Sequence, residues 1–340
     1  MKLFLYEHIT SGALINEPLP TSLAREGNDM LTAIVQDLIE LSRIELILLR
    51  DSRLKPLESI VAEPTHQVYT VDNATSFDEA YLSAITNADM VLVIAPETEG
   101  ILDEIQQQIR NSGTQLLASH TEATQLCSDK YLCHQQLRAH GISSPTTVKA
   151  NEWSSNKFSS VTGFIIKPLD GAGCIDTFFM RNSAVLEAWL VSHSDDLNKL
   201  IIQPYIEGLT VSLSLLADHD DSRVLAVNQQ NMKLDNDKLF FLGSIVNGVT
   251  EADLAFSQAS KIAANIHQAI EGLWGFIGID LILHEDKLFV VDINPRLTTS
   301  YIGLRQSLNH NPAELLFTMM KEGLSALPKQ LQRQAIEVKV

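Results

Sequence analysis

Four polar side chains in the C-terminal third of the chain have the types and spacing of a metal site. Asp292, Asn294 and Arg296 form a D-x-N-x-R run at the end of an apolar segment, and Asp280 lies in an earlier segment whose apolar residues alternate. Period-two alternation and the polar break at residues 285–287 predict a hairpin that brings Asp280 beside Asp292. Two carboxylates and an amide oxygen suit Mg²⁺. The alternative is a hairpin with a solvated polar face.

A glycine-rich turn and two lysines predict a phosphate site. Lys167 ends a predicted strand at residues 164–167. The turn that follows contains Asp170, Gly171, Ala172 and Gly173. Small residues let main-chain N–H groups approach a phosphate, and a lysine adds a point charge. Lys130, on a short predicted helix capped by Ser128 or Asp129, is a second candidate. The alternatives are a plain hairpin turn and a surface lysine.

A buried strand that runs into a proline predicts a binding segment for a nucleotide ring. The segment contains Gln203, Pro204, Tyr205, Ile206 and Glu207. An extended segment leaves main-chain groups free to pair with an adenine edge, with Tyr205 and Ile206 beside the ring. Either Glu207 or Thr210 would take the ribose hydroxyls. Taken alone, the segment also fits an ordinary linker.

The first third of the chain must position one end of such a site. Strands are predicted at residues 2–6, 44–49, 68–71, 90–94 and 115–118, with helices at 23–41, 77–87 and 98–111. Strands that alternate with helices predict a parallel α/β sheet covered on both faces. Ligands collect at the carboxyl ends of such strands, where Glu7, Ser11, Gly12 and Glu97 lie. Neither G-x-G-x-x-G nor G-x-x-x-x-G-K-[ST] occurs.

The rest of the chain reads as strands and helices that build a second unit. Antiparallel strands are predicted at residues 210–216, 224–231 and 239–243, before a helix at 251–271 and the hairpin. Helices at 299–307 and 312–322 follow, and Gly323 is a natural helix stop. Residues 323–340 are expected to form a loose tail.

The amino-acid composition indicates which kinds of partner and which cellular compartment to expect. The net charge of −17 argues against nucleic acid or an anionic membrane as the main partner, because both bind basic patches. The three cysteines lack C-x-x-C spacing, which predicts a reducing compartment and no zinc site. The first six residues are too short for a signal sequence, and no run is long enough to span a membrane. We expect a cytoplasmic protein with small-molecule partners; a homodimer is left open.

The order of these motifs resembles the ATP-grasp superfamily over roughly residues 115–320. The resemblance implies a fold in which two α+β subdomains clamp ATP, preceded by an α/β domain. The implied domains are residues 1–118, 119–205 and 206–322, with 323–340 as the tail. The implied cofactors are ATP and Mg²⁺, with Mn²⁺ as a substitute.

The resemblance also implies a role for each motif. Lys130 and Lys167 would contact ATP phosphates under a flexible loop at residues 170–176, and Gln203, Pro204, Tyr205 and Ile206 would hold adenine. Asp280, Asp292 and Asn294 would hold the metal, and Lys167 and Arg296 would be catalytic, with Arg296 facing the acyl group. Three positions depart from the usual pattern: Gln203 and Thr210 stand where acids are common, and Asp292 replaces a commoner Glu.

Four further segments resemble the tyramine–L-glutamate ligases of methanofuran-type cofactor synthesis. They are EHITSGAL, LAREGNDMLTAIVQDL, VLAVNQQNM and NPRLTTSYIGL. The resemblance implies that ATP activates a carboxylate of L-glutamate as an acyl phosphate, which a phenolic amine then attacks. Expected substrate contacts are Glu7, Ser11, Gln230, Thr298 and Tyr301, whose alternative role is loop capping. The rival functions are a ligase for another amine, a phosphotransferase and a non-catalytic nucleotide sensor.

Overall fold

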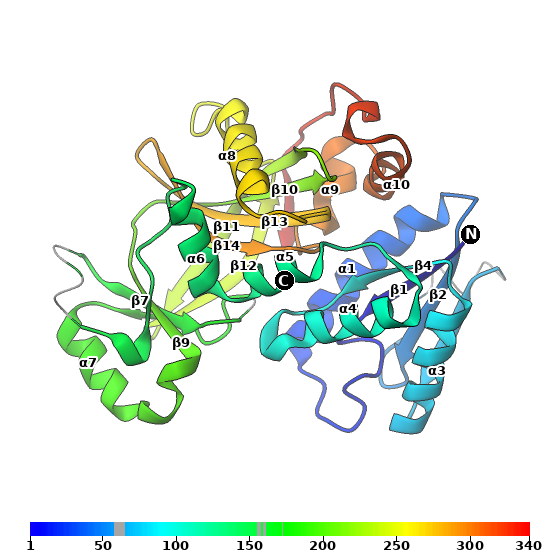
Figure 1. Cartoon of the computed structure of the whole chain (residues 1–340), viewed down its shortest axis with the longest axis horizontal. Helices are drawn as coiled ribbons and strands as arrows, with labels where there is room; N and C mark the ends of the chain where they lie inside the picture. The colour runs from blue at the N-terminus through cyan, green and yellow to red at the C-terminus, as the bar shows by residue number, and fades with distance from the viewer. Residues whose placement is uncertain (58–64, 155–157, 159–160, 172) are drawn as a thin grey trace.

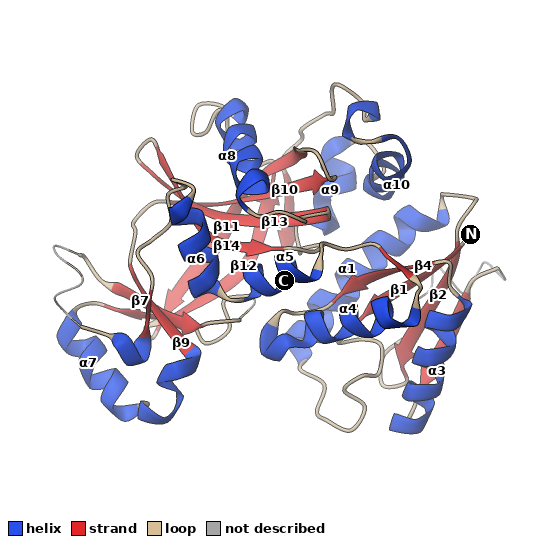
Figure 2. Ribbon diagram, viewed as in Figure 1, coloured by secondary structure: helices blue, strands red, loops and turns tan. Residues whose placement is uncertain are grey.

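Two β-sheets organise the computed structural model of the chain, which describes residues 1–57, 65–154, 158, 161–171 and 173–340. The first sheet has five parallel strands in the order β3-β2-β1-β4-β5. These are β1 (Lys2–Glu7), β2 (Glu45–Asp51), β3 (Gln67–Val71), β4 (Met90–Ile94) and β5 (Gln115–Leu116). Figure 2 shows this sheet at the right and a larger antiparallel sheet at the centre and left. The predicted parallel α/β unit is therefore confirmed.

Helices cover both faces of the parallel sheet because its strands are apolar at successive positions. Leu3 and Leu5 pack with the apolar face of α1 (Thr21–Ile39). Phe4 and Tyr6, which point to the other face, pack with α3 (Ala74–Asn87) and α4 (Ile101–Ser112). The core on the α1 side continues into helices from the C-terminal part of the chain, so the two sheets share one packed interface.

The second sheet has ten strands in the described residues, and its strand pairs are antiparallel. Its order is β14-β13-β10-β11-β12-β8-β7-β9-β6, with β15 also on β12. The strands are β6 (Val148–Lys149), β7 (Phe164–Pro168), β8 (Phe178–Met180), β9 (Leu200–Pro204), β10 (Leu209–Ala217), β11 (Ser222–Asp235), β12 (Lys238–Val246), β13 (Gly275–His284), β14 (Lys287–Asn294) and β15 (Ile336–Lys339). Among the residues that the structure describes, a single register pair, Lys238 with Phe178, joins β12 to β8. The β14-β13-β10-β11-β12 half and the β8-β7-β9-β6 half of the sheet are therefore joined by a short strand pairing.

The helices of the second unit cover this sheet and connect it to the first (Figure 1). They are α5 (Thr121–Ser128), α6 (Lys130–Ala139), α7 (Ser183–Ser192), α8 (Phe256–Ala269), α9 (Tyr301–Leu308) and α10 (Pro312–Glu322). Short 3-10 turns lie at η1 (Thr98–Gly100), η2 (Ala150–Glu152), η4 (Ser194–Lys199) and η5 (Leu324–Ala326). None of the helices in the described residues is long and apolar enough to cross a membrane.

Two predictions about elements were wrong. Residues 323–340 are not a loose tail, because β15 pairs with β12 and the Val338 side chain is buried in the shared core. The helix expected from residue 251 begins only at Phe256, because the Thr250 hydroxyl and the Glu251 carboxylate hold the preceding residues in a turn. The proposed domain boundaries stay a prediction.

Candidate active site

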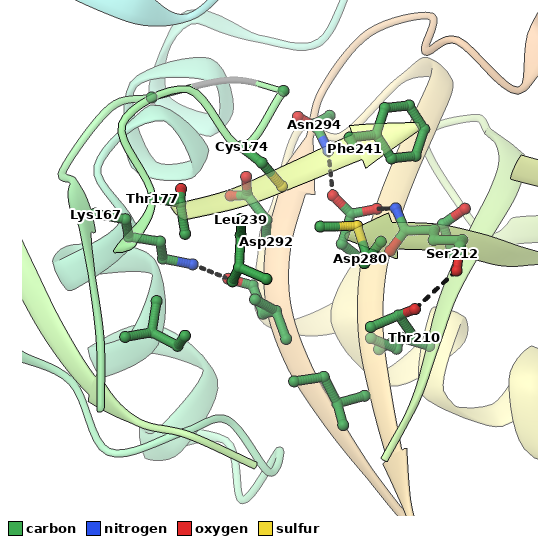
Figure 3. Close-up of a pocket in the computed structure, with 18 of the residues that line it drawn as sticks. Lys167, Cys174, Thr177, Thr210, Ser212, Leu239, Phe241, Asp280, Asp292 and Asn294 are labelled. Carbon is green, nitrogen blue, oxygen red and sulfur yellow. Dashed lines mark hydrogen bonds between the residues drawn. The ribbon is translucent and has the colours of Figure 1, made fainter. Parts of the chain in front are cut away.

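A cavity of about 270 Å³ lies between the β7–β9 half of the large sheet and the β13–β14 hairpin. Figure 3 shows side chains from both halves pointing into it. Among the predicted site residues, its lining includes Lys130, Lys167, Gly171, Gly173, Gln203, Pro204, Tyr205, Ile206, Thr210, Gln230, Asp280, Asp292, Asn294, Arg296 and Thr298. Motifs far apart in sequence thus meet at one place. Ala172 lies outside the described residues.

The carboxylate pair depends on the register of the hairpin. β13 and β14 pair Asp280 directly with Asp292 and Gly278 with Asn294, which confirms the predicted juxtaposition. Asp280 accepts hydrogen bonds from the Gln230 amide at 2.9 Å and from the Asn294 amide at 3.3 Å. Burial raises the pKa of Asp280 to about 6, and the charge of Asp292 adds to the effect. A cation beside Asp280 would therefore be favoured.

Two buried lysines face this pair. Asp129 caps α6 through the N–H groups of Tyr131 and Leu132, so Lys130 opens the helix as predicted. Its Nζ lies 2.8 Å from Asp292 Oδ2. Burial acts against the charge of Lys130, but Asp292 and Glu97 raise its pKa overall. Lys167 donates to the Val291 carbonyl at 3.5 Å, and burial lowers the pKa of Lys167 to about 8.

The donors at the hairpin fit a divalent cation with a mostly non-protein shell. The Asn294 amide nitrogen donates to Asp280, which leaves the amide oxygen for a ligand. Within the described part of the chain, no cluster of three or more His, Cys, Asp or Glu side chains could hold a metal. Two carboxylates and one amide oxygen match Mg²⁺, which usually takes its remaining ligands from water and phosphate.

The hinge after β9 forms the opposite end of the cavity. The Gln203 amide donates to the Thr147 hydroxyl at 2.9 Å, and the Tyr205 N–H donates to the Gly163 carbonyl at 2.8 Å. Tyr205 is thus already engaged through its N–H, and we expect Ile206 to offer the main-chain contact to a ring. Thr210 lines the cavity but donates to the Gln230 carbonyl, while the exposed Glu207 does not line it.

The glycine turn is tied to the N-terminal unit. Gly173 and Cys174 have positive φ values of 63° and 60°. The Asp170 carboxylate accepts the Glu99 N–H at 2.7 Å, so the turn touches the loop after β4. Cys174, labelled in Figure 3, also lines the cavity, which no motif in the sequence had predicted.

Arg296 is held by an acid from the N-terminal unit. Its Nε and Nη2 donate to the two carboxylate oxygens of Glu97 at 2.8 and 2.7 Å, and its Nη1 donates to the Leu297 carbonyl at 3.1 Å. Glu97 follows β4, at the predicted carboxyl edge of the parallel sheet. A second acid, Glu26 of α1, also lines the cavity and was not predicted.

Three expected substrate contacts lie outside the cavity lining. Glu7 is buried and accepts hydrogen bonds from Ile9 and Thr10, and Ser11 donates to the His8 carbonyl. The buried Tyr301 hydroxyl donates to Asp37 of α1 at 2.7 Å. In this structure these residues shape the loop after β1 and hold α1, so the capping alternative describes their contacts.

The sequence matches known protein families and a named ligase. A family model described as ATP-grasp domain matches residues 127–300, and one described as pre ATP-grasp 3 domain matches residues 44–124. The chain is 24% identical over 298 residues to a tyramine--L-glutamate ligase of Methanocaldococcus jannaschii, covering 87% of this chain and 82% of that protein.

Solved structures share the fold. A crystal structure from Archaeoglobus fulgidus, described as an ATP-grasp superfamily protein, matches with a TM-score of 0.70 at 22% identity and covers 100% of this chain and 96% of its own. The D-alanine--D-alanine ligase of Bacillus anthracis in complex with ATP matches with a TM-score of 0.62 at 14% identity, covering 96% and 98% of the two chains. The expected fold class is confirmed.

Proposed function

The chain belongs to the ATP-grasp family and is an ATP-dependent ligase, and from this premise we propose that it joins the γ-carboxylate of L-glutamate to tyramine or a related phenolic amine. One observation supports this above the others: two carboxylates, two lysines and an arginine meet in a single cavity. The proposed pathway is synthesis of a methanofuran-type cofactor. Similarity to tyramine--L-glutamate ligases over most of the chain supports the substrate pair.

The first half-reaction would occur where the lysines face the carboxylate pair. An oxygen of the substrate carboxylate attacks the γ-phosphorus of ATP, the bond to the β-phosphate oxygen breaks, and ADP leaves. Lys130 and Lys167 would balance the negative charge that spreads over the phosphoryl oxygens. Asp280, Asp292 and Asn294 would hold Mg²⁺ or Mn²⁺, which supplies further charge neutralisation when bound.

The second half-reaction would occur near Arg296. The amine nitrogen attacks the acyl carbon, phosphate leaves and the amine releases a proton to solvent. Negative charge develops on the acyl oxygen, and a guanidinium aimed at that oxygen would stabilise it. Because Glu97 fixes the guanidinium by two hydrogen bonds, Arg296 needs little reorganisation during the step.

The test is a substrate panel. Purified protein receives ATP, Mg²⁺, L-glutamate and either tyramine, tyrosine, phenethylamine or a second glutamate; ADP release and product mass are measured. We expect a γ-amide with tyramine. If the phenol hydroxyl is fully buried and hydrogen-bonded, kcat/KM for phenethylamine should be lower than that for tyramine by up to about 10⁴-fold.

The outcomes separate the proposal from its rivals. An amide formed only between two amino acids would move the protein to another ligase class. A stable phosphorylated product without any amide would indicate a phosphotransferase. ATP binding without turnover for every amine would indicate a nucleotide sensor.

A further inference from the structure

An unpaired acid lies at the Arg296 end of the cavity. Glu26, in the second turn of α1, lines the cavity and is half-buried. One of its carboxylate oxygens accepts a hydrogen bond from the Thr299 hydroxyl, from the loop that follows D-x-N-x-R. Within the described residues, no lysine, arginine or histidine forms an ion pair with Glu26.

The nearby arginine does not satisfy this acid. The charge of Glu26 helps to raise the pKa of Arg296, but the two side chains form no ion pair, and three of the five N–H bonds of Arg296 already donate to Glu97 or to the Leu297 carbonyl. Lys130 is likewise paired, with Asp292. A carboxylate that is partly removed from water without a cation of its own favours a cation brought by a ligand.

Helix α1 holds Glu26 firmly in this position. Asp37, three turns further along α1, accepts hydrogen bonds from the Tyr301 hydroxyl at 2.7 Å and from Arg305 at 3.0 Å. Closer to Glu26, Gly27 packs directly on Glu7, where an added Cβ would lie 2.6 Å from a carboxylate oxygen. Contacts at Gly27 and at Asp37 thus fix this part of α1. Glu26 therefore reaches the cavity from a fixed helix and not from a flexible loop.

We propose that Glu26 binds the α-ammonium group of the amino acid whose side-chain carboxylate is activated. This inference rests on the proposed function and adds a residue that selects the acid substrate. The attacking amine is the less suitable partner, because a neighbouring carboxylate stabilises the protonated form and a protonated amine cannot attack. An ammonium that does not react has no such conflict.

Charge removal at Glu26 tests the assignment. Steady-state kinetics with ATP, Mg²⁺ and saturating tyramine would compare L-glutamate with glutarate, which has the same carbon chain but no ammonium. A second series would vary tyramine at saturating L-glutamate. Glu26→Gln keeps the side-chain shape and an oxygen for Thr299. It should lower kcat/KM for L-glutamate by about 10- to 100-fold, the value of one charge-assisted hydrogen bond. Its kcat/KM for glutarate should stay the same or rise, because one repulsive charge is gone.

Asp29→Asn is the matched control, since Asp29 lies on the same helix, carries the same charge and does not line the cavity. It should keep the wild-type preference for L-glutamate over glutarate. If Glu26→Gln lowers kcat/KM for both acids equally, or changes only the KM for tyramine, the proposed role is wrong while the ligase function stands. If the wild type makes no amide and releases no ADP with L-glutamate, the proposed function fails together with this inference.

Discussion

Glu97→Gln tests whether the second half-reaction depends on the support of Arg296. The two hydrogen bonds between these side chains are 2.8 and 2.7 Å long, and only 12% of the Arg296 side chain and 5% of the Glu97 side chain are exposed. Glutamine keeps one acceptor oxygen but places an N–H group against the second guanidinium nitrogen. The variant therefore loses one charge-assisted hydrogen bond and leaves part of a buried charge uncompensated.

The expected cost follows from these contacts. A hydrogen bond to a charged group contributes about 1.5–3 kcal/mol, and breaking a buried ion pair costs about 3–5 kcal/mol. Glu26 and Asp292 still act on the Arg296 charge, so we place the loss of stability at about 2–3 kcal/mol. Amide formation should slow by about 10- to 100-fold, less than the 10²- to 10³-fold typical of removing an oxyanion donor outright.

The assay separates the two half-reactions. Hydroxylamine, which traps an acyl phosphate as a hydroxamate without needing a precisely placed amine, should still give product with Glu97→Gln. The rate of amide formation should fall, and the midpoint of unfolding should shift to a lower urea concentration. Glu99→Gln is the control, because it removes the same charge from an exposed position in the same loop. Wild-type amide rates and wild-type unfolding in Glu97→Gln would refute the reasoning.

Two further predictions concern the phosphate end. Asp292→Asn should lower Mg²⁺-dependent ADP release by at least about 10²-fold and also reduce stability, because it removes the negative charge that pairs with the buried Lys130. Near-normal ADP release by the folded variant would contradict the metal assignment. The apparent Kd for ATP should rise by up to about tenfold per pH unit above pH 8, because Lys167 loses its charge as pH rises through its pKa of about 8. Lys167→Arg, which stays charged, should flatten that dependence in calorimetric titrations at pH 7, 8 and 9. A flat wild-type profile would mean that the charge of Lys167 is not needed to bind ATP.

The sequence predicted those features that depend on local pattern. The alternation of residues 277–283 and the apolar run after the turn were enough to pair Asp280 with Asp292, because a hairpin fixes its own register. The parallel sheet was predicted equally well, because apolar strands that alternate with amphipathic helices are compatible with few other folds. Ser128 and Asp129 were both candidate caps before Lys130, and the structure shows that Asp129 caps the helix.

The features that the sequence did not predict depend on partners far along the chain. Glu26 and Thr299 are 273 positions apart, and Glu97 and Arg296 are 199 apart. No periodicity relates such residues, so the position of Glu26 at the cavity could be found only from the packed structure. The contact of Tyr301 is of the same kind: its residue type suggests a substrate pocket, and in the structure its hydroxyl donates to Asp37 of α1, 264 positions away.

The origin of the cavity residues suggests how the two halves of the chain divide the reaction. Lys167, Asp280 and Asp292 all come from the antiparallel sheet, and they surround the position proposed for phosphoryl transfer. Glu26 and Glu97 come from the parallel unit, and their side-chain hydrogen bonds are to Thr299 and Arg296, at the other end. Substitutions on α1 or after β4 should therefore alter which acid and amine are joined more than they alter ATP binding. Because Asp37 and Tyr301 fix α1 against α9, the same contact that joins the two halves also sets the position of the substrate-selecting acid.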